Sequence, residues 1–155
     1  MLHIELPNLI VEQIVTAIDQ VAKSQAIDNF AGTYTSSDGN SSITVSSDDS
    51  PALALTAWTW EGRDLYTDLF ELLVPDIDIR ILPNQLYGGD QVGFTSYYQP
   101  PAPDRLFFGS CFSWVDVDEL TFGNIPLGQL VFEVDGSGRA VAVGSKSLGV
   151  RMERA

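Results

Sequence analysis

Residues 30–47 read Phe30-Ala-Gly-Thr-Tyr-Thr-Ser-Ser-Asp-Gly-Asn-Ser-Ser-Ile-Thr-Val-Ser-Ser47, and the hydrophobic period of the chain changes here from helical to extended. The runs 30–35 and 42–47 flank a cluster of serine, aspartate, glycine and asparagine. Two extended runs around such a cluster are typical of a β-hairpin. The sequence therefore predicts that a sheet begins at this point.

Further strand signals follow, most of them separated by short glycine-, aspartate- or serine-rich turns. Nine ranges have strand character: 30–35, 42–47, 52–60, 77–82, 91–98, 105–118, 130–135, 139–144 and 147–153. Evenly spaced strands with short connections favour an antiparallel meander that closes on itself, and closure protects apolar edges. We predict a mainly β (α+β) fold, an antiparallel lipocalin-like β-barrel of about eight strands. A short helix is expected at Leu65–Leu73, before Pro75.

The segment before the hairpin predicts an amphipathic helix. Between Pro7 and Asn29, apolar residues recur at steps of four, four and three: Ile10, Ile14, Ile18 and Val21. This spacing places them on one face of an α-helix, which predicts that this face is buried. We expect this helix to pack on the outside of the barrel or to cap one end. Residues 1–155 then form a single domain, with the helix in 1–29 and the barrel in 30–155.

Composition and charge exclude several classes of partner. The chain has 155 residues, 45% of them hydrophobic, with 8 Lys and Arg against 21 Asp and Glu and a formal net charge of −13. The absence of basic clusters argues against nucleic acids and anionic membranes. The start of the chain does not resemble a signal peptide, which predicts a cytoplasmic protein. The sequon Asn40-Ser41-Ser42 matters only if the chain is part of a longer, secreted precursor.

Residues that usually carry hydrolytic, redox or metal chemistry are scarce. His3 is the one histidine, so neither a His-based triad nor a multi-histidine metal site can be built. Cys111 is the one cysteine, which excludes an internal disulfide, and its place within a strand favours a buried, inert thiol. We predict no metal and no cofactor.

Charged residues on two predicted strands are the candidate catalytic groups. Asp116 and Asp118 share a strand face with Trp114, and either they point inward, where burial would permit acid–base chemistry, or they face solvent. Arg80 alternates with Ile77, Ile79 and Ile81. Either the isoleucines line the interior and Arg80 lies outside, or they pack against the helix and Arg80 points inward. We select Arg80 and Asp116 as candidates to polarise a substrate.

Aromatic residues are the candidate ligand-binding groups. Trp58 and Trp60 share one face of a strand, and Tyr97 and Trp114 lie on two further strands. Such residues either fill a core or line a cavity for an apolar ligand. A cavity of this kind could fold a flexible polyene into a reactive conformer, because positioning alone can contribute about 7–11 kcal/mol.

Several short motifs, in their order and spacing, resemble the C-terminal domain of fungal β-lactamase-like serine hydrolases over about Ala22 to Arg154. The motifs are Phe30-Ala-Gly-Thr-Tyr-Thr35, Asn40-Ser-Ser-Ile-Thr-Val45, Ala57-Trp-Thr-Trp60, Asp78-Ile-Arg-Ile-Leu-Pro83, Ser113-Trp-Val-Asp-Val117 and Leu130-Val-Phe-Glu-Val-Asp-Gly-Ser-Gly138. The resemblance implies a β-barrel that carries no catalytic residues. Neither lysine, Lys23 or Lys146, belongs to a Ser-x-x-Lys motif, so the family's serine chemistry is excluded for this chain.

Two functions from different classes follow. The first is a free-standing barrel, monomeric or homodimeric, that binds a hydrophobic small molecule and acts as a cofactor-free cyclase or isomerase of fungal secondary metabolism, including pericyclic chemistry. The alternative is a non-catalytic accessory domain of a β-lactamase-like hydrolase, which would expose an apolar docking patch. A self-associating structural protein is a third, weaker alternative.

Overall fold

The computed structural model describes residues 21, 23–50, 52–71, 78–84, 88–99 and 121–155. Residues 23–30 are helical. The strands are β1 (Gly32–Thr35), β2 (Ser42–Ser46), β3 (Leu53–Trp60), β4 (Arg63–Asp64), β5 (Asp78–Pro83), β6 (Gln91–Gln99), β7 (Thr121–Phe122), β8 (Ile125–Pro126), β9 (Gln129–Val134), β10 (Ala140–Ser145) and β11 (Val150–Arg154). A π-helix, η1 (Tyr66–Glu71), follows β4.

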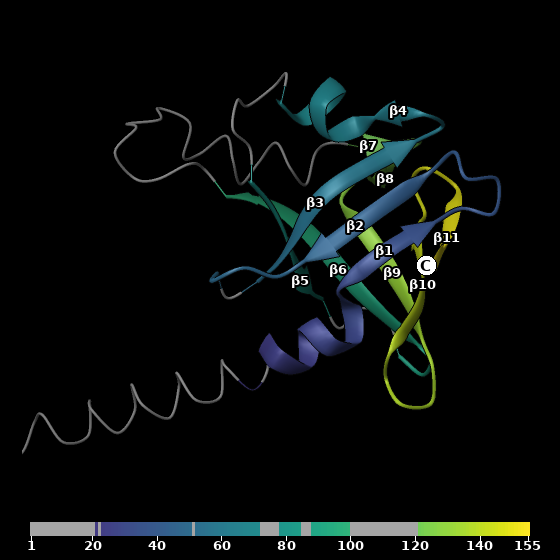
Figure 1. The fold of residues 1–155 in the computed structure, drawn as a ribbon. Helices are drawn as coiled ribbons and strands as arrows, with labels where there is room; N and C mark the ends of the chain where they lie inside the picture. The colour runs from purple at the N-terminus through teal and green to yellow at the C-terminus, as the bar shows by residue number, and fades with distance from the viewer. Residues whose placement is uncertain (1–20, 22, 51, 72–77, 85–87, 100–120) are drawn as a thin grey trace, which may run out of the picture.

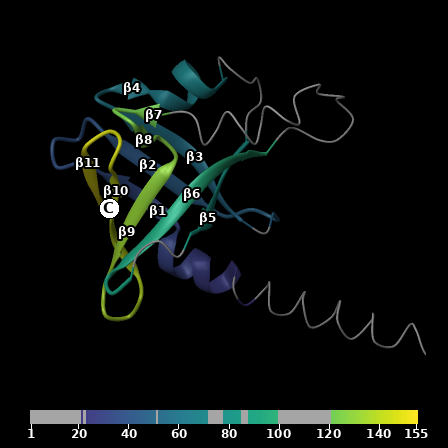
Figure 2. The same ribbon diagram turned by 180° about the vertical axis from the view of Figure 1, so that it is seen from behind.

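Eight strands form a closed antiparallel barrel (Figures 1 and 2). The order around the ring is β2-β1-β11-β10-β9-β6-β5-β3, and β3 pairs back with β2 to close it. The barrel predicted from the sequence is therefore confirmed. Eight of the nine predicted strand ranges correspond to these strands, while the ninth, 105–118, lies outside the described residues.

Three short strands were not predicted from the sequence. β4 extends the sheet beyond β3, and β7 pairs with β8 in a separate two-stranded ribbon. Each has only two residues, too few to show a period of two. The helix expected at 65–73 is present in its described part as a π-helix, with Leu65, Tyr66 and Leu69 packed against the core.

The helix at 23–30 lies across one end of the barrel (Figure 1). Ala26, Ile27 and Phe30 pack against the buried core. The hydroxyl of Tyr34 on β1 donates to the carbonyl of Phe30 at 2.7 Å, and Arg154 on β11 donates to the carbonyl of Asn29 at 3.0 Å. The described part of the helix therefore caps the barrel; the predicted residues up to 20 lie outside the described ranges.

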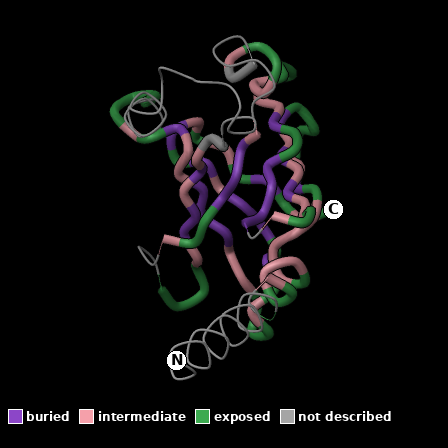
Figure 3. Tube along the Cα trace, turned by 90° about the vertical axis from the view of Figure 1, so that its left-hand side faces the viewer, coloured by how far each residue is buried: buried purple, intermediate pink, exposed green. Residues whose placement is uncertain are grey.

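The barrel encloses an apolar core along its axis (Figure 3). At the helix end, the ring of Phe132 meets those of Phe94, Tyr34 and Phe30 edge-on, with centroids 5.0, 5.5 and 5.4 Å away. Farther along, Trp58 is only 1% exposed. These side chains therefore form the buried core of the described part of the barrel.

Candidate functional site

Arg80 lies on the outer face of β5. Ile79 and Ile81 belong to the core, and successive side chains of a strand point to opposite faces, so Arg80 points away from the interior. Of the two orientations considered for this strand, the one with Ile79 and Ile81 inside and Arg80 outside is therefore correct, while Ile77 lies outside the described residues. The Arg80 side chain is nevertheless only 5% exposed.

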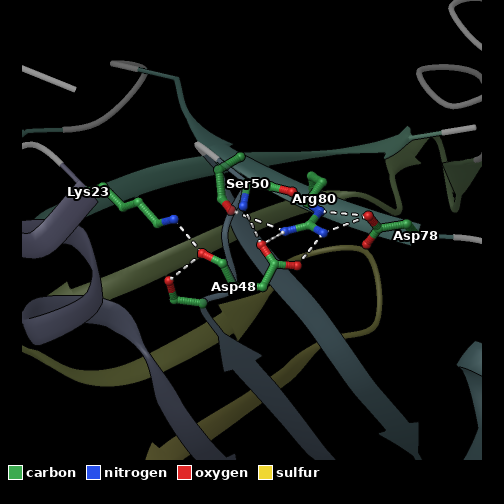
Figure 4. Close-up of polar contacts among 7 residues, drawn as sticks. Lys23, Asp48, Ser50, Asp78 and Arg80 are labelled. Carbon is green, nitrogen blue, oxygen red and sulfur yellow. Dashed lines mark hydrogen bonds and ion pairs between the residues drawn. The ribbon is translucent and has the colours of Figure 1, made fainter. Parts of the chain in front are cut away.

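The Arg80 guanidinium is held by two carboxylates and a carbonyl (Figure 4). Nη1 and Nη2 donate to the two oxygens of Asp48 at 2.8 and 2.6 Å. Nε and Nη2 donate to Oδ2 of Asp78 at 2.9 and 2.6 Å, and Nη1 makes a longer contact of 3.4 Å with the carbonyl of Ala52. Because a guanidinium has five N–H groups, these bonds use all of them.

The same bonds fix the charges of Arg80 and Asp48. Hydrogen bonds from Arg80 hold the pKa of Asp48 well below its usual range, and the Ser50 N–H, 2.8 Å from Oδ1, lowers it further. Hydrogen bonds that Arg80 donates to Asp48 raise the pKa of Arg80 above its ordinary value, against the effect of burial. Arg80 is therefore a permanent cation and cannot transfer a proton.

The cluster joins three separate parts of the chain. Asp48 lies between β2 and β3, 32 positions before Arg80. The ammonium group of Lys23, on the N-terminal helix, donates to the backbone carbonyl of Asp48 (Figure 4). The cluster thus fastens the β2–β3 connection to β5 and to the helix. The catalytic role predicted for Arg80 would first require one of these hydrogen bonds to break.

Tyr97 lies beside Arg80 on the outer face. The two residues are directly opposite each other on β6 and β5, which places their side chains on the same face. Burial raises the pKa of Tyr97, and the nearby Arg80 charge partly opposes this rise. Tyr97 therefore does not share the interior with Trp58, contrary to the arrangement expected from the sequence.

A β-bulge positions the two tryptophans of β3. Thr44 pairs with Ala57 and Val45 pairs with Leu55, so Thr56 is the extra residue of the bulge. Because of this extra residue, Leu55 and Trp58 both point into the core although they are three positions apart.

Trp60 lies at the end of β3, at the barrel end opposite the N-terminal helix (Figure 1). We call this end, where β4, η1 and the β7–β8 ribbon lie, the open end because the N-terminal helix does not cover it. It is half-buried, and its ring meets that of Phe122 edge-on, with centroids 5.7 Å apart. Phe122 is 53% exposed. Trp58 and Trp60 therefore differ in environment: Trp58 is a core residue, and Trp60 is part of an accessible aromatic pair. The other two candidates, Trp114 and Asp116, lie outside the described residues and remain predictions.

Comparison with protein families identifies the barrel. Residues 22–155 match the family described as Beta-lactamase-like-like, C-terminal domain. The chain belongs to this family. The resemblance inferred from the sequence motifs is thus confirmed. No match was found among curated proteins, and none among solved structures.

Two important residues of this β-lactamase-like C-terminal domain were not selected from the sequence. Asp48 stands in Ser47-Asp-Asp-Ser-Pro51, which reads as an ordinary polar turn, and only the barrel brings it to Arg80. Phe122 lies on a strand of two residues, which has no periodic signal.

Metal-binding clusters and membrane-spanning helices are both absent from the described residues. Within them, no group of three or more His, Cys, Asp and Glu side chains is placed to hold a metal ion. In the same ranges, no helix has the length and apolar character needed to span a membrane.

Proposed function

We propose that this chain works as a non-catalytic barrel domain that binds a β-lactamase-like catalytic domain. The observation that carries this proposal is the match of residues 22–155 to the family of β-lactamase-like C-terminal domains. Tyr34 and Phe132 are 0% exposed and Trp58 is 1% exposed, so these aromatic side chains belong to the core of the barrel.

Chemical reasoning supports the same function. A β-lactamase-like hydrolase needs a nucleophilic serine and a nearby lysine, and the sequence contains no Ser-x-x-Lys motif. Arg80, the best-placed cation of the candidate site, already uses its donors to hold the β2–β3 connection. Arg80, Asp48 and Asp78 therefore form an ion-pair cluster with a structural role.

The open end is the surface that we assign to the partner. Trp60 and Phe122 present an aromatic pair there, and large aromatic residues are enriched at the centres of protein interfaces. Val141 on β10 is comparably exposed, at 44% against 53% for Phe122, but it lies beside Ala140 near the helix end. Val141 therefore offers a matched control for the open end.

The test is co-elution of this chain with a β-lactamase-like catalytic domain from the same organism on gel filtration. We expect a 1:1 complex that Phe122→Ser weakens at least tenfold and that Val141→Ser leaves unchanged. The chain alone should not hydrolyse a chromogenic cephalosporin or a p-nitrophenyl ester above the buffer rate. Independent elution of the two proteins, or equal effects of the two variants, would contradict the proposal.

A second candidate function is binding of a hydrophobic small molecule at the open end. It is favoured by the half-buried Trp60, whose ring could stack with an apolar ligand beside Phe122. The cyclase or isomerase of fungal secondary metabolism expected from the sequence is the catalytic form of this candidate. It ranks second because Trp58 is packed in the core and Tyr97 lies on the outer face.

Titration of tryptophan fluorescence with a long-chain polyene distinguishes the second candidate. Saturable quenching that Phe122→Ala abolishes and Val141→Ala does not would support a ligand site at the open end. Quenching that rises linearly without saturation would exclude it. Conversion of the polyene to a product, lost in Asp116→Asn, would support catalysis.

A further inference from the structure

Asn40 begins the sequon Asn40-Ser41-Ser42 and lies in the turn between β1 and β2. Of the five asparagines in the chain, it is the one followed two positions later by serine or threonine with a residue other than proline between them. This pattern is the acceptor signal for N-linked glycosylation. The turn adjoins the open end, because the Gly62 N–H donates to the Asn40 carbonyl at 2.8 Å and the Glu61 N–H donates to the Ser41 hydroxyl at 3.1 Å. The aromatic pair assigned to the partner contains no residue of the turn.

The structure places the Asn40 side chain at an accessible position. The loop that joins β1 to β2 extends away from the barrel (Figure 1), and Asn40 is exposed. A Cβ atom built on the neighbouring Gly39 would meet nothing within 4 Å. A bulky group on Asn40 therefore has open space around the tip of the hairpin.

The turn is held by groups that glycosylation would leave intact. Ser36 N–H donates to the Ser41 carbonyl at 2.8 Å, and Ser41 N–H donates to the Ser36 hydroxyl at 2.9 Å. The Asn40 backbone N–H donates to Asp38 at 3.0 Å. The Asn40 side chain contributes a hydrogen bond of 3.2 Å from Nδ2 to Asp38, and a glycosylated amide keeps one N–H that can preserve it.

We propose that Asn40 is an N-glycosylation site, modified when this chain passes through the lumen of the secretory pathway. The co-substrate is an oligosaccharide carried on a lipid diphosphate. A bond forms between Nδ2 of Asn40 and C1 of the first sugar, and the bond between C1 and the diphosphate oxygen breaks. The lipid diphosphate leaves with the electron pair, and Nδ2 loses one proton. The site lies on the barrel surface, so the glycan is compatible with the folded domain.

The test is secretion of the full chain from yeast behind a cleavable leader, followed by intact mass measurement before and after endoglycosidase treatment. The wild-type chain should carry one glycan that the enzyme removes. Asn40→Gln and Ser42→Ala should each abolish it while the circular dichroism spectrum stays that of a β-barrel. Two variants are used because one of them could disturb the hairpin.

Asp135→Asn provides a matched positive control. It creates a sequon with Gly136 and Ser137 in another exposed turn, and the new amide keeps the Oδ1 atom that accepts hydrogen bonds from the Ser137 and Arg139 N–H groups. We expect two glycans on this variant. Secreted wild-type protein with the mass of the bare polypeptide overturns the proposal. The proposal is also overturned if Asp135→Asn carries one glycan and the double variant Asp135→Asn, Asn40→Gln still carries it, because that glycan is then attached at position 135.

Discussion

Replacing Arg80 with alanine should destabilise the barrel more than replacing Arg151 or Arg154 with alanine. Loss of one partner from a buried ion pair costs about 3–5 kcal/mol. Here the carboxylates of Asp48 and Asp78 are 48% and 38% exposed, so water can solvate them once the guanidinium is gone. The lower end of the range therefore applies, about 3 kcal/mol, which lowers the Tm of a domain of this size by about 6–12 °C.

The assay is urea unfolding followed by tryptophan fluorescence and circular dichroism, with Arg151→Ala as the matched control. Arg151 also makes a bidentate pair, at 2.9 and 2.7 Å to Glu133, and a third bond of 2.8 Å to Glu153. Its side chain is 49% exposed, so its removal should cost about 1 kcal/mol or less. Equal losses for the two variants would refute the structural role assigned to Arg80.

Three further changes test other parts of the structure. Asp48→Asn should make the free energy of unfolding depend less on pH in acid, because Arg80 depresses the pKa of Asp48 in the folded state. The stabilisation from ionised Asp48 is complete above its unfolded pKa of about 3.9 and is lost as the pH falls toward its folded pKa. Urea unfolding at pH 7, 4 and 3 checks this, and a wild-type-to-variant difference that stays constant with pH would contradict it. Arg154→Ala should cost about 2 kcal/mol, since this side chain donates to three backbone carbonyls at the helix end of the barrel, and amide hydrogen exchange should rise there first. Gly128→Ala should cost about 1–3 kcal/mol, because the new Cβ would lie 2.2 Å from the hydroxyl of Ser96, and Ser96→Ala in the same chain should restore most of the loss in a thermal melt.

The barrel could be predicted from the sequence because each wall strand carries its own signal. Ile79 and Ile81 alternate with Arg80 on β5, and the turn after β1 contains the residues that hairpins require. The bulge at Thr56 could not be predicted in this way, because it breaks the regular alternation on which such a prediction rests. The one extra residue reverses the face of every residue that follows it in β3. The predicted shared face of Trp58 and Trp60 was correct because both residues follow the bulge.

The candidate site was harder to predict than the fold. The environment of Arg80 depends on Asp48, which the chain brings to it only when β3 and β5 pair. No local pattern encodes that contact. The face of Tyr97, in contrast, could have been obtained by counting from Phe94, because three positions along a regular strand reverse the face.

Hydrogen–deuterium exchange of the chain alone and in the presence of the β-lactamase-like catalytic domain tests the proposed function most directly. We expect slower exchange in residues 60–70 and 121–126, which form the open end, and unchanged exchange in the helix and around Val141. Unchanged exchange throughout the chain, or protection confined to the helix end, would contradict the assignment of this barrel as a docking domain.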